Sequence, residues 1–313
     1  MTDQNHYEII VIGSGPAGFT AAIYAVRGGA SAALFGGMAP GGQLLQTMEI
    51  ENYPGFTDPV VGADLMQKMM KQTQRLGARV LQESIVSADL SSRPFKLKSS
   101  GGQQYTADAL ILATGAQARW LGTPSEEKFK GKGVSGCATC DGFFYRGKEV
   151  AVIGGGDSAA EDALFLTKFA SKVYLVHRRD KLRASFRLQE KLKSNPKVEL
   201  VYDHVPEEFL GDAKLSAVRL KNVKTGETRE LAVSGAFIAI GHTPATELVK
   251  GQLKLDEDGY IVTDDRTAAS VDGVYAAGDV MDTRYKQAVV AAGAGCKAAL
   301  EALAFIEGCP KRA

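Results

Sequence analysis

The sequence predicts an α/β protein made of two similar units, the second inserted into the first. One observation is a pattern that occurs twice: a β-branched strand, a glycine-rich loop, a helix and a second strand. A second observation is that strand and loop segments suited to the first unit return only near the C-terminus. The chain has 313 residues, 45% of them hydrophobic, which is enough apolar material for two cores.

The first copy of the pattern begins near the N-terminus. Residues 7–12 predict a buried parallel strand, residues 19–26 a helix and residues 31–35 the next strand. In a G-x-G-x-x-G loop the first glycine permits a tight turn, the second lets a pyrophosphate approach the backbone, and the third lets the helix pack on the strand. The helix N-terminus also offers free N–H groups to phosphate. We therefore interpret this loop as a dinucleotide site rather than a plain turn. Its residues are Gly13, Ser14, Gly15, Pro16, Ala17 and Gly18.

The second copy occupies residues 149–176. It predicts strands at 149–153 and 172–176 and a helix at 159–169. Alanine is an accepted residue at the third small position of such a loop. Glu161 falls in the first turns of the helix, near the expected place of a nicotinamide ribose. The loop residues are Gly154, Gly155, Gly156, Asp157, Ser158 and Ala159.

The residues that follow each copy indicate which dinucleotide binds. In the second copy the strand is followed by His177, Arg178 and Arg179, and then by Arg183. An NAD site typically has an acidic residue for the ribose 2′-hydroxyl, whereas guanidinium groups pair with a 2′-phosphate. We therefore predict NADPH, the alternative being a solvated basic helix start. The first copy ends at Gly36 without an acidic residue, so this argument does not identify its ligand.

Further segments suggest a flavin site in the first unit. The loop of Gly41, Gly42, Gln43 and Leu44 suits close backbone contact with an extended ligand. A strand at 109–113 ends at Ala113 and leads to Thr114 and Gly115, and a strand at 273–277 leads to Gly278 and Asp279. The Asp279 carboxylate could accept a hydrogen bond from a sugar-alcohol hydroxyl, or it could cap the following helix. The helix predicted at 287–306 would direct its positive N-terminal end toward the isoalloxazine ring.

The order of these segments gives the domain organisation. We predict two Rossmann-like dinucleotide-binding domains, with the NADPH domain inserted into the FAD domain. The FAD-binding domain comprises residues 1–116 and 245–313, and the NADPH-binding domain comprises residues 117–244. Turn residues stand at both joints.

The chain has four cysteines, of which only Cys137 and Cys140 lie close together. A C-x-x-C pair can form a small disulfide ring in which one thiol has a lowered pKa. The same pair could be half of a zinc site or a buried unreactive pair, but zinc needs about four ligands and no other cysteine or histidine cluster is near in sequence. Asp141 is a candidate proton donor or acceptor for the thiolates, or a cap of the next turn. Cys296 and Cys309 are expected to be bystanders. The pair lies within the predicted NADPH domain, yet nicotinamide and dithiol must each reach the flavin, so we expect a hinge rotation.

The overall charge and the N-terminus limit the remaining classes of function. A net charge of +1 gives no electrostatic case for binding nucleic acid or an anionic membrane. No uninterrupted apolar run approaches the roughly 20 residues of a membrane span, and the polar first residues do not resemble a secretory signal. We therefore expect a cytoplasmic protein without a metal.

Motifs along nearly the whole chain resemble those of the low-molecular-weight thioredoxin reductases. The matching segments are GSGPAG (13–18), GGQL (41–44), ENYPGF (51–56), ATGA (113–116), CATCDG (137–142), GGGDSA (154–159), HRRDKLRAS (177–185), AIGHTP (239–244) and AAGDV (276–280) with a following QA. This resemblance implies FAD and NADPH as cofactors, thioredoxin as the disulfide substrate, a homodimer and a rotation between domains.

The resemblance also implies roles for individual residues. Cys140 would be the thiol beside the flavin, Cys137 the thiol that exchanges with thioredoxin, and Asp141 the acid that protonates the flavin-side thiolate. Arginines 178, 179 and 183 would contact NADPH together with the second glycine loop and Glu161. The further residues expected at the cofactors are Gly36, Asn52, Ile85, Ile240, Gly241, Lys286, Gln287 and Ala288.

Three departures from the family pattern stand out. Lys286 occupies a position where many relatives have arginine. Residues 123–126 (TPSE) replace the usual PGE, which we expect to loosen one turn. The absence of an acidic residue after Phe35 also occurs in some members of the family.

Other functions remain open at this point. A peroxiredoxin-reducing flavoprotein of the same fold normally carries an N-terminal thioredoxin-like extension, whereas this sequence starts at the first strand. An oxygen-using dithiol oxidase would not need the full arginine cluster. A flavin-binding sensor or scaffold would not turn over with a disulfide acceptor.

Overall fold

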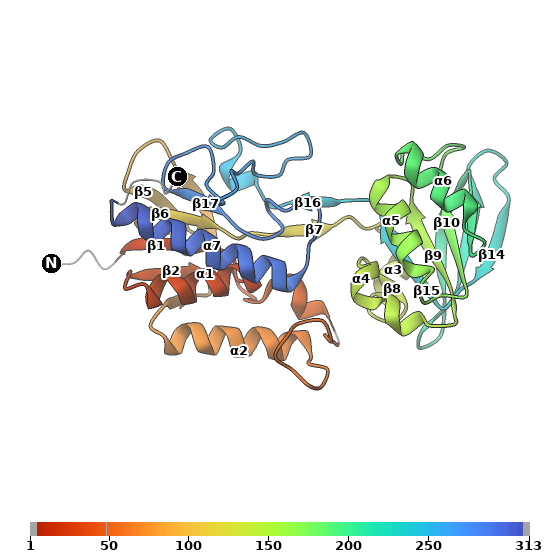
Figure 1. The fold of residues 1–313 in the computed structure, drawn as a ribbon, viewed down its shortest axis with the longest axis horizontal. Coiled ribbons are helices and arrows are strands. Elements are labelled where there is room, and N and C mark those ends of the chain that lie inside the picture. Colours follow the sequence, from red (N-terminus) through yellow and green to blue (C-terminus); the bar gives the residue numbers. More distant parts are fainter. Residues whose placement is uncertain (1–4, 48, 309–313) are drawn as a thin grey trace. The chain divides into compact units, whose positions relative to one another are not determined.

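The structure is a computed structural model that describes residues 5–47 and 49–308 (Figure 1). The chain forms two compact units. Unit 1 comprises Met1–Gln117 and Thr243–Ala313, and unit 2 comprises Ala118–His242. These divisions lie within two residues of the expected joints at 116/117 and 244/245. The connecting segments β7 (Ala116–Ala118) and β16 (His242–Pro244) pair as a two-stranded sheet. Cys309 lies outside the described residues.

Unit 1 is built on a seven-stranded sheet with the order β3-β2-β1-β6-β5-β4, and β17 also pairs with β6. The first predicted strand, β1 (His6–Ile12), runs parallel to β2 (Ala32–Phe35) and to β6 (Gln104–Leu112). Its residues 9–12 are buried, as a strand flanked on both sides requires. The remaining strands are β3 (Arg79–Leu81), β4 (Ile85–Asp89), β5 (Phe95–Ser99) and β17 (Val274–Ala276).

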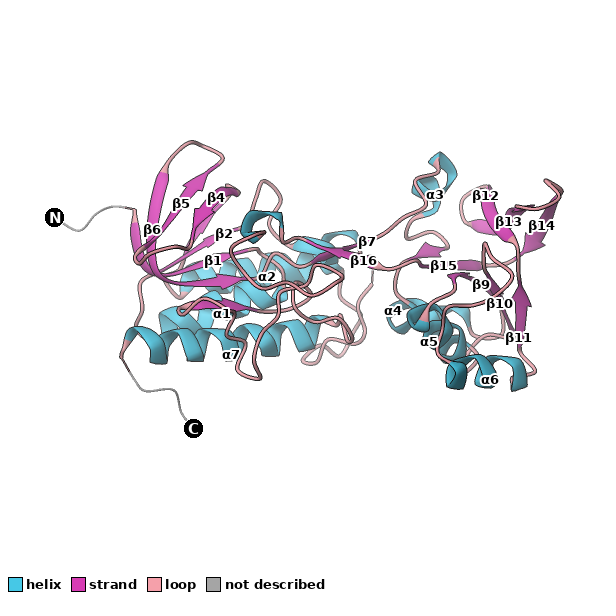
Figure 2. Ribbon diagram, turned by 90° about the horizontal axis from the view of Figure 1, so that it is seen from above, coloured by secondary structure: helices cyan, strands magenta, loops and turns pink. Residues whose placement is uncertain are grey.

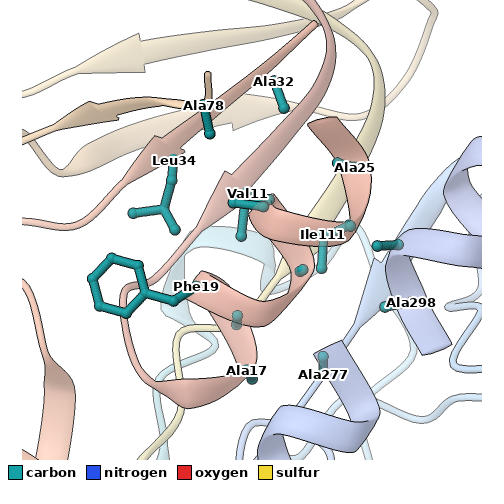
Figure 3. Close-up of a cluster of buried hydrophobic side chains, with 14 of the residues drawn as sticks. Val11, Ala17, Phe19, Ala25, Ala32, Leu34, Ala78, Ile111, Ala277 and Ala298 are labelled. Carbon is teal, nitrogen blue, oxygen red and sulfur yellow. The ribbon is translucent and has the colours of Figure 1, made fainter. Parts of the chain in front are cut away.

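Helices α1 (Pro16–Arg27), α7 (Ala288–Ile306) and α2 (Gly62–Arg75) contribute to the larger core of unit 1 (Figures 1 and 2). Figure 3 shows this core, in which Val11, Phe19 and Ala298 come from a strand and two helices. Small residues let α1 and α7 approach closely, because a Cβ added at Gly295 would lie 2.1 Å from the carbonyl oxygen of Ala17. By length and composition α7 could also span a membrane; 39% of its apolar window is buried, and those residues pack in this core.

Unit 2 has a five-stranded parallel sheet with the order β11-β10-β9-β15-β8. These strands are β8 (Val134–Ser135), β9 (Glu149–Gly154), β10 (Lys172–Val176), β11 (Val198–Val201) and β15 (Gly235–Ala239). Helices α4 (Ala138–Asp141), α5 (Asp157–Leu166) and α6 (Phe186–Ser194) lie on one side of it (Figure 2). On the other side is an antiparallel sheet of β12 (His204–Gly211), β13 (Leu215–Asn222) and β14 (Thr228–Ala232). The predicted fold class, α/β with two similar dinucleotide-binding folds, is confirmed.

Several local expectations differ from the structure. The helix expected at 19–26 is α1, which already begins at Pro16, and the strand expected at 109–113 is β6, which begins at Gln104 and ends at Leu112. The helix expected at 159–169 begins at Asp157, because Gly156 is its N-cap, and it ends at Leu166. The turn expected to loosen at 123–126 is closely hydrogen-bonded instead. The buried carboxylate of Glu126 accepts the backbone N–H groups of Leu121 and Gly122 at 2.9 and 2.8 Å. Thr123 caps the short helix α3 (Pro124–Phe129) by accepting from the backbone of Glu126.

Candidate active site

Cys137 and Cys140 form a disulfide with a Cα–Cα distance of 5.3 Å. Cys137 is the N-cap of helix α4, and its Sγ accepts the backbone N–H of Cys140 at 3.2 Å. A hydrogen bond to sulfur favours the thiolate when the pair is reduced. Within unit 2, Cys137 is half-buried and Cys140 is exposed. Hydrogen bonding therefore marks Cys137 as the better stabilised thiolate, while exposure favours Cys140.

Asp141 follows the disulfide directly and is half-buried. Burial raises the pKa of Asp141, and a hydrogen bond with Ser135 partly opposes that rise. The nearby Tyr145 is also perturbed: burial, with a smaller contribution from the charge of Asp141, raises its pKa to about 12. A carboxyl group with a raised pKa next to the cysteine pair is suited to donate a proton.

Ser135 is a residue that the sequence analysis did not select. Its hydroxyl is buried, accepts the backbone N–H of Cys137 at 3.0 Å and hydrogen-bonds with the carboxyl of Asp141. It therefore connects the proposed acid to the first cysteine. The serine lies at the end of strand β8, where it pairs with Phe237 of β15.

The disulfide helix and the second glycine loop belong to the same unit and share a core. Ala138 of α4 packs with Ala159 and Ala160 of α5, the helix that follows the glycine loop. Phe143 and Phe144, directly after the disulfide, are 52% and 39% exposed. The C-x-x-C segment therefore packs against helix α5 and has exposed aromatic side chains close after it in the sequence.

In the glycine loop of unit 2, two glycines pack closely against the protein and one has open space beside it. A Cβ at Gly154 would lie 2.3 Å from the carbonyl oxygen of Ala239, and a Cβ at Gly155 would lie 2.2 Å from the ring of His177. At these two positions the packing of the protein leaves no room for a side chain. At Gly156 nothing lies within 4 Å of an added Cβ. That open space at the N-cap of α5 is where a pyrophosphate would approach the backbone.

The basic segment after β10 is attached to this loop. The backbone N–H groups of Arg183 and Ala184 donate to the carbonyl oxygen of Gly155 at 2.7 and 3.1 Å. The N–H of Ser185 donates to Oδ1 of Asp157 at 2.6 Å, so one predicted loop residue binds the protein itself. The side chains of Arg178, Arg179 and Arg183 are all exposed, as are Ser158 and Glu161.

His177 is a buried side chain of the basic segment, with 6% of its surface exposed, whereas the three arginines are exposed. Burial lowers its pKa, the charges of Arg179 and Arg183 lower it further, and hydrogen bonds to the backbone oppose the change. His177 is therefore a neutral imidazole whose ring packs against Gly155. Ile240 and Gly241, the other residues expected in this unit, lie beyond strand β15, and Gly241 accepts the backbone N–H of Arg119 at 2.9 Å.

The glycine loop of unit 1 has the same division. A Cβ at Gly13 would lie 2.1 Å from the carbonyl oxygen of Ala113, and a Cβ at Gly18 would lie 1.9 Å from that of Gly13. Nothing lies within 4 Å of an added Cβ at Gly15. An added Cβ therefore meets no protein atom within 4 Å at Gly15 in unit 1 and at Gly156 in unit 2, the second glycine position of the G-x-G-x-x-G/A pattern in each loop, which fits an extended phosphate ligand.

Other expected residues of unit 1 gather around this loop. Ser14 donates its hydroxyl to the carbonyl oxygen of Gly36 at 2.9 Å and accepts the N–H of Gly41 at 3.1 Å. An added Cβ at Gly42 would lie 3.4 Å from Cα of Gly15, and one at Gly278 would lie 3.0 Å from Cβ of Ala17. Residues from four separate segments therefore meet at one end of the sheet.

Several residues that the sequence analysis expected at a cofactor instead contact other parts of the protein. Leu44 packs against the core, Ile85 is buried in a second core cluster, and Pro16 occupies the first turn of α1. Thr114 donates its hydroxyl to the carbonyl oxygen of Ala245 at 2.7 Å, next to the positive-φ residue Gly115. Gln43 is exposed, so its side chain is available to a ligand.

Asp279 and Lys286 lie before the start of α7, close enough for the charge of each to shift the pKa of the other, and the ammonium of Lys286 donates to the carbonyl oxygen of Thr283 at 2.6 Å. Burial raises the pKa of Asp279 to about 6, the charge of Lys286 lowers it, and the charge of Asp282 raises it. Lys286 itself has a lowered pKa because of its burial, which its acidic neighbours oppose. Gln287, the N-cap of α7, accepts a hydrogen bond at 3.4 Å from the side chain of Asn52, and Ala288 begins the helix.

The described residues contain no group of three histidine, cysteine or acidic side chains arranged to hold a metal ion. The two vicinal thiols are joined to each other. The disulfide of unit 2 therefore indicates a redox pair.

Two glycine loops, each between a pair of parallel strands and one of them sharing its unit with a vicinal disulfide, define a class of protein, the pyridine nucleotide-disulphide oxidoreductases. The family model of that description matches residues 7–295. A thioredoxin reductase of Rickettsia conorii is 50% identical over 303 residues, covering 96% of this chain and 98% of that protein. One from Yarrowia lipolytica is 52% identical over 310 residues, covering 95% and 97%. A solved thioredoxin reductase of Giardia duodenalis has a TM-score of 0.93 and 46% identity, covering 97% of this chain and all of that one.

The chain therefore belongs to the pyridine nucleotide-disulphide oxidoreductase family and, within it, to the thioredoxin reductases.

Proposed function

We propose that this protein is an NADPH-dependent reductase of the thioredoxin disulfide, with FAD in unit 1 and NADPH in unit 2. The observation that carries the proposal is the vicinal disulfide on helix α4, which packs on the dinucleotide-binding helix α5 and is followed by a half-buried carboxyl group with a raised pKa. Sequence identity of about 50% with thioredoxin reductases over almost the whole chain supports the choice of substrate.

The residues present fit both dinucleotides. Each loop has one glycine with open space above it, Gly15 in unit 1 and Gly156 in unit 2, as close approach of a pyrophosphate requires. Exposed arginines beside the second loop suit the 2′-phosphate that distinguishes NADPH from NADH. In unit 1, Asp279 and Lys286 offer a carboxyl and an ammonium group beside the N-terminus of α7, which suits the hydroxyl-bearing chain and polar ring of FAD. When bound, FAD would supply electron transfer from the nicotinamide to the disulfide.

The residues of the C-x-x-C segment would then perform thiol–disulfide exchange. Reduction of the Cys137–Cys140 bond takes up two electrons, and Asp141 donates a proton to the sulfur of Cys140. The Cys137 thiolate, stabilised by the N–H of Cys140, attacks one sulfur of the thioredoxin disulfide, so that a mixed disulfide forms and a thioredoxin thiolate leaves. Cys140 next returns its proton to Asp141 and attacks the sulfur of Cys137 as a thiolate, which releases the second thioredoxin thiolate and restores the original disulfide. The electrons gained by thioredoxin equal those taken up by the pair.

A change in the arrangement of the two units follows from this assignment. The disulfide and the proposed NADPH loop both lie in unit 2, whereas the proposed flavin loop lies in unit 1. Each of the two must reach the same flavin, so they do so in turn, through rotation about the paired connecting strands β7 and β16.

We also propose a homodimer located in the cytoplasm. Unit 1 exposes apolar side chains on both of its adjacent helices, with Tyr24 of α1 being 40% and Leu300 of α7 being 52% exposed. Such side chains suit a subunit interface. Sedimentation equilibrium should give twice the chain mass, and a monomer at micromolar concentration would contradict the dimer.

Single cysteine variants test the order of attack. Cys137→Ser should abolish thioredoxin reduction, because the attacking thiolate is lost, while leaving reduction of the flavin by NADPH intact. Cys140→Ser should retain the attacking thiol and accumulate a mixed disulfide with thioredoxin that mass spectrometry can detect. If Cys137→Ser instead forms the adduct and Cys140→Ser does not, Cys140 is the outer thiol, as its greater exposure within unit 2 would favour.

Arginine variants test the nucleotide. Replacing Arg178 and Arg179 with alanine should raise the KM for NADPH about a hundredfold or more, because two charge-assisted contacts to the 2′-phosphate are lost. The KM for NADH should change little. Arg229→Ala, at an exposed position on β14 of the same unit, is the control. Equal effects on the two nucleotides would contradict the assignment of NADPH.

Anaerobic titration of the yellow protein with NADPH separates this function from its rivals. A thioredoxin reductase should take up a further pair of electrons beyond those held by the flavin, and then pass them to oxidised thioredoxin. A flavin-binding sensor would not turn over, and a dithiol oxidase would consume oxygen with free dithiols instead of NADPH.

A further inference from the structure

Phe186 is the most exposed aromatic side chain among the described residues, with 78% of its surface accessible. It occupies the first position of helix α6. A phenyl ring in water loses the favourable free energy of burial, so a ring held this far out suits a ligand or a partner. The other exposed phenylalanines of unit 2, Phe143 and Phe144, follow the disulfide in the sequence, so Phe186 lies in a different segment.

The backbone places Phe186 beside the second glycine loop. The three preceding residues are all hydrogen-bonded to that loop, Arg183 and Ala184 through the carbonyl oxygen of Gly155 and Ser185 through the carboxylate of Asp157. Asp157 is the first residue of α5. Phe186 therefore begins its helix directly after an attachment to the N-terminal end of the dinucleotide-binding helix.

The charged neighbours indicate which end of a dinucleotide lies here. Arg178, Arg179, Arg183 and Arg187 are exposed on the same segment. If they hold the 2′-phosphate of NADPH, the adenine is close by, because the phosphate and the base are attached to adjacent carbons of one ribose. Adenine is flat and apolar on both faces, and such faces stack on aromatic rings.

We propose that Phe186 stacks on the adenine of NADPH and thereby contributes to the affinity for adenine dinucleotides. The inference rests on the proposed NADPH site of unit 2 and adds to it a residue outside the glycine loop and the arginine cluster. The ring supplies dispersion and apolar contact on one face of the base, while the arginines supply charge to the phosphate.

The test is calorimetric titration of the full-length flavoprotein with adenosine 2′,5′-bisphosphate, which carries the base and the 2′-phosphate but no nicotinamide. Phe186→Ala should raise the Kd about tenfold, the loss expected for one base–aromatic stack. Phe186→Tyr should stay within about twofold of the wild type because it keeps the ring. Phe186→Leu keeps apolar surface without an aromatic face and should resemble the alanine variant. Val223→Ala, at another exposed apolar residue of unit 2, is the matched control and should bind as the wild type does.

The outcomes distinguish the two levels of the argument. If the wild type binds the bisphosphate and Phe186→Ala binds it equally well, the stacking role is wrong while the NADPH site stands. If the wild type does not bind it, the nucleotide site itself is wrong and the inference falls with it. A Phe186→Ala variant with an unchanged Kd but a raised KM for thioredoxin would assign the ring to a protein contact and overturn the proposal.

Discussion

Gly156→Ala should weaken nucleotide binding while leaving the stability of the fold nearly unchanged. The backbone at Gly156 has φ −92° and ψ −175°, a conformation open to alanine, and nothing lies within 4 Å of the added Cβ. Alanine lowers the entropy of the unfolded chain, which stabilises by about 0.4–1 kcal/mol, and it is a poorer N-cap than glycine by a similar amount. The free energy of unfolding should therefore change by less than about 1 kcal/mol.

The matched variant is Gly154→Ala, two residues earlier in the same loop. Its Cβ would lie 2.3 Å from the carbonyl oxygen of Ala239 and 2.7 Å from Cβ of Ala159. Neither the strand backbone nor a buried alanine can move away cheaply, so this variant should lose about 1–3 kcal/mol or more. Urea unfolding of both variants, followed by circular dichroism, measures the difference.

Nucleotide binding, in contrast to stability, should be impaired in Gly156→Ala, because the added methyl group fills the space that a pyrophosphate needs. We expect the Kd for NADP⁺ to rise at least about tenfold, which corresponds to about 1.4 kcal/mol. Calorimetry with NADP⁺ avoids flavin reduction during the titration. A Gly156→Ala protein that binds NADP⁺ as tightly as the wild type, or that unfolds as easily as Gly154→Ala, would refute the division of the loop into ligand-facing and fold-facing glycines.

Two further predictions concern pH. Burial raises the pKa of Asp141, so the protonated acid is lost as pH rises through that pKa. The rate of disulfide reduction, followed by stopped-flow flavin absorbance, should therefore fall over the same pH range. Asp141→Asn should be about 100-fold slower than the wild type, and its rate should not depend on pH in this way. A variant as fast as the wild type would exclude Asp141 as the acid. The folded-state pKa of Asp279 is about 6, above the ordinary 3.8. The protonated carboxyl therefore stabilises the folded, flavin-free protein below pH 4, and this stabilisation is lost as pH rises to about 6. The loss amounts to at most about 3 kcal/mol in the free energy of unfolding. Asp279→Asn should remove this slope from urea unfolding measured between pH 4 and 7, whereas Glu257→Gln, an exposed control, should keep it; an unchanged slope in Asp279→Asn would contradict the burial argument.

Much of the fold followed from local patterns. The run of apolar residues at 7–12 predicted a strand with neighbours on both sides, and β1 pairs in parallel with β2 and β6. The repeated strand–loop–helix pattern located both glycine loops. The ends of elements were less accurate, as in α5, because a helix end depends on capping and on the turn that follows it.

The sequence by itself determined which chemistry the chain carries, since the two glycine loops and the C-x-x-C pair act through residues that are adjacent along the backbone. Only the tertiary structure decided which of these residues are free for a ligand. The contact of Gly154 with Ala239, the attachment of Ser185 to Asp157 and the connection of Ser135 to Asp141 all join residues from different elements. Such contacts depend on how strands and helices pack, and no local spacing encodes that packing.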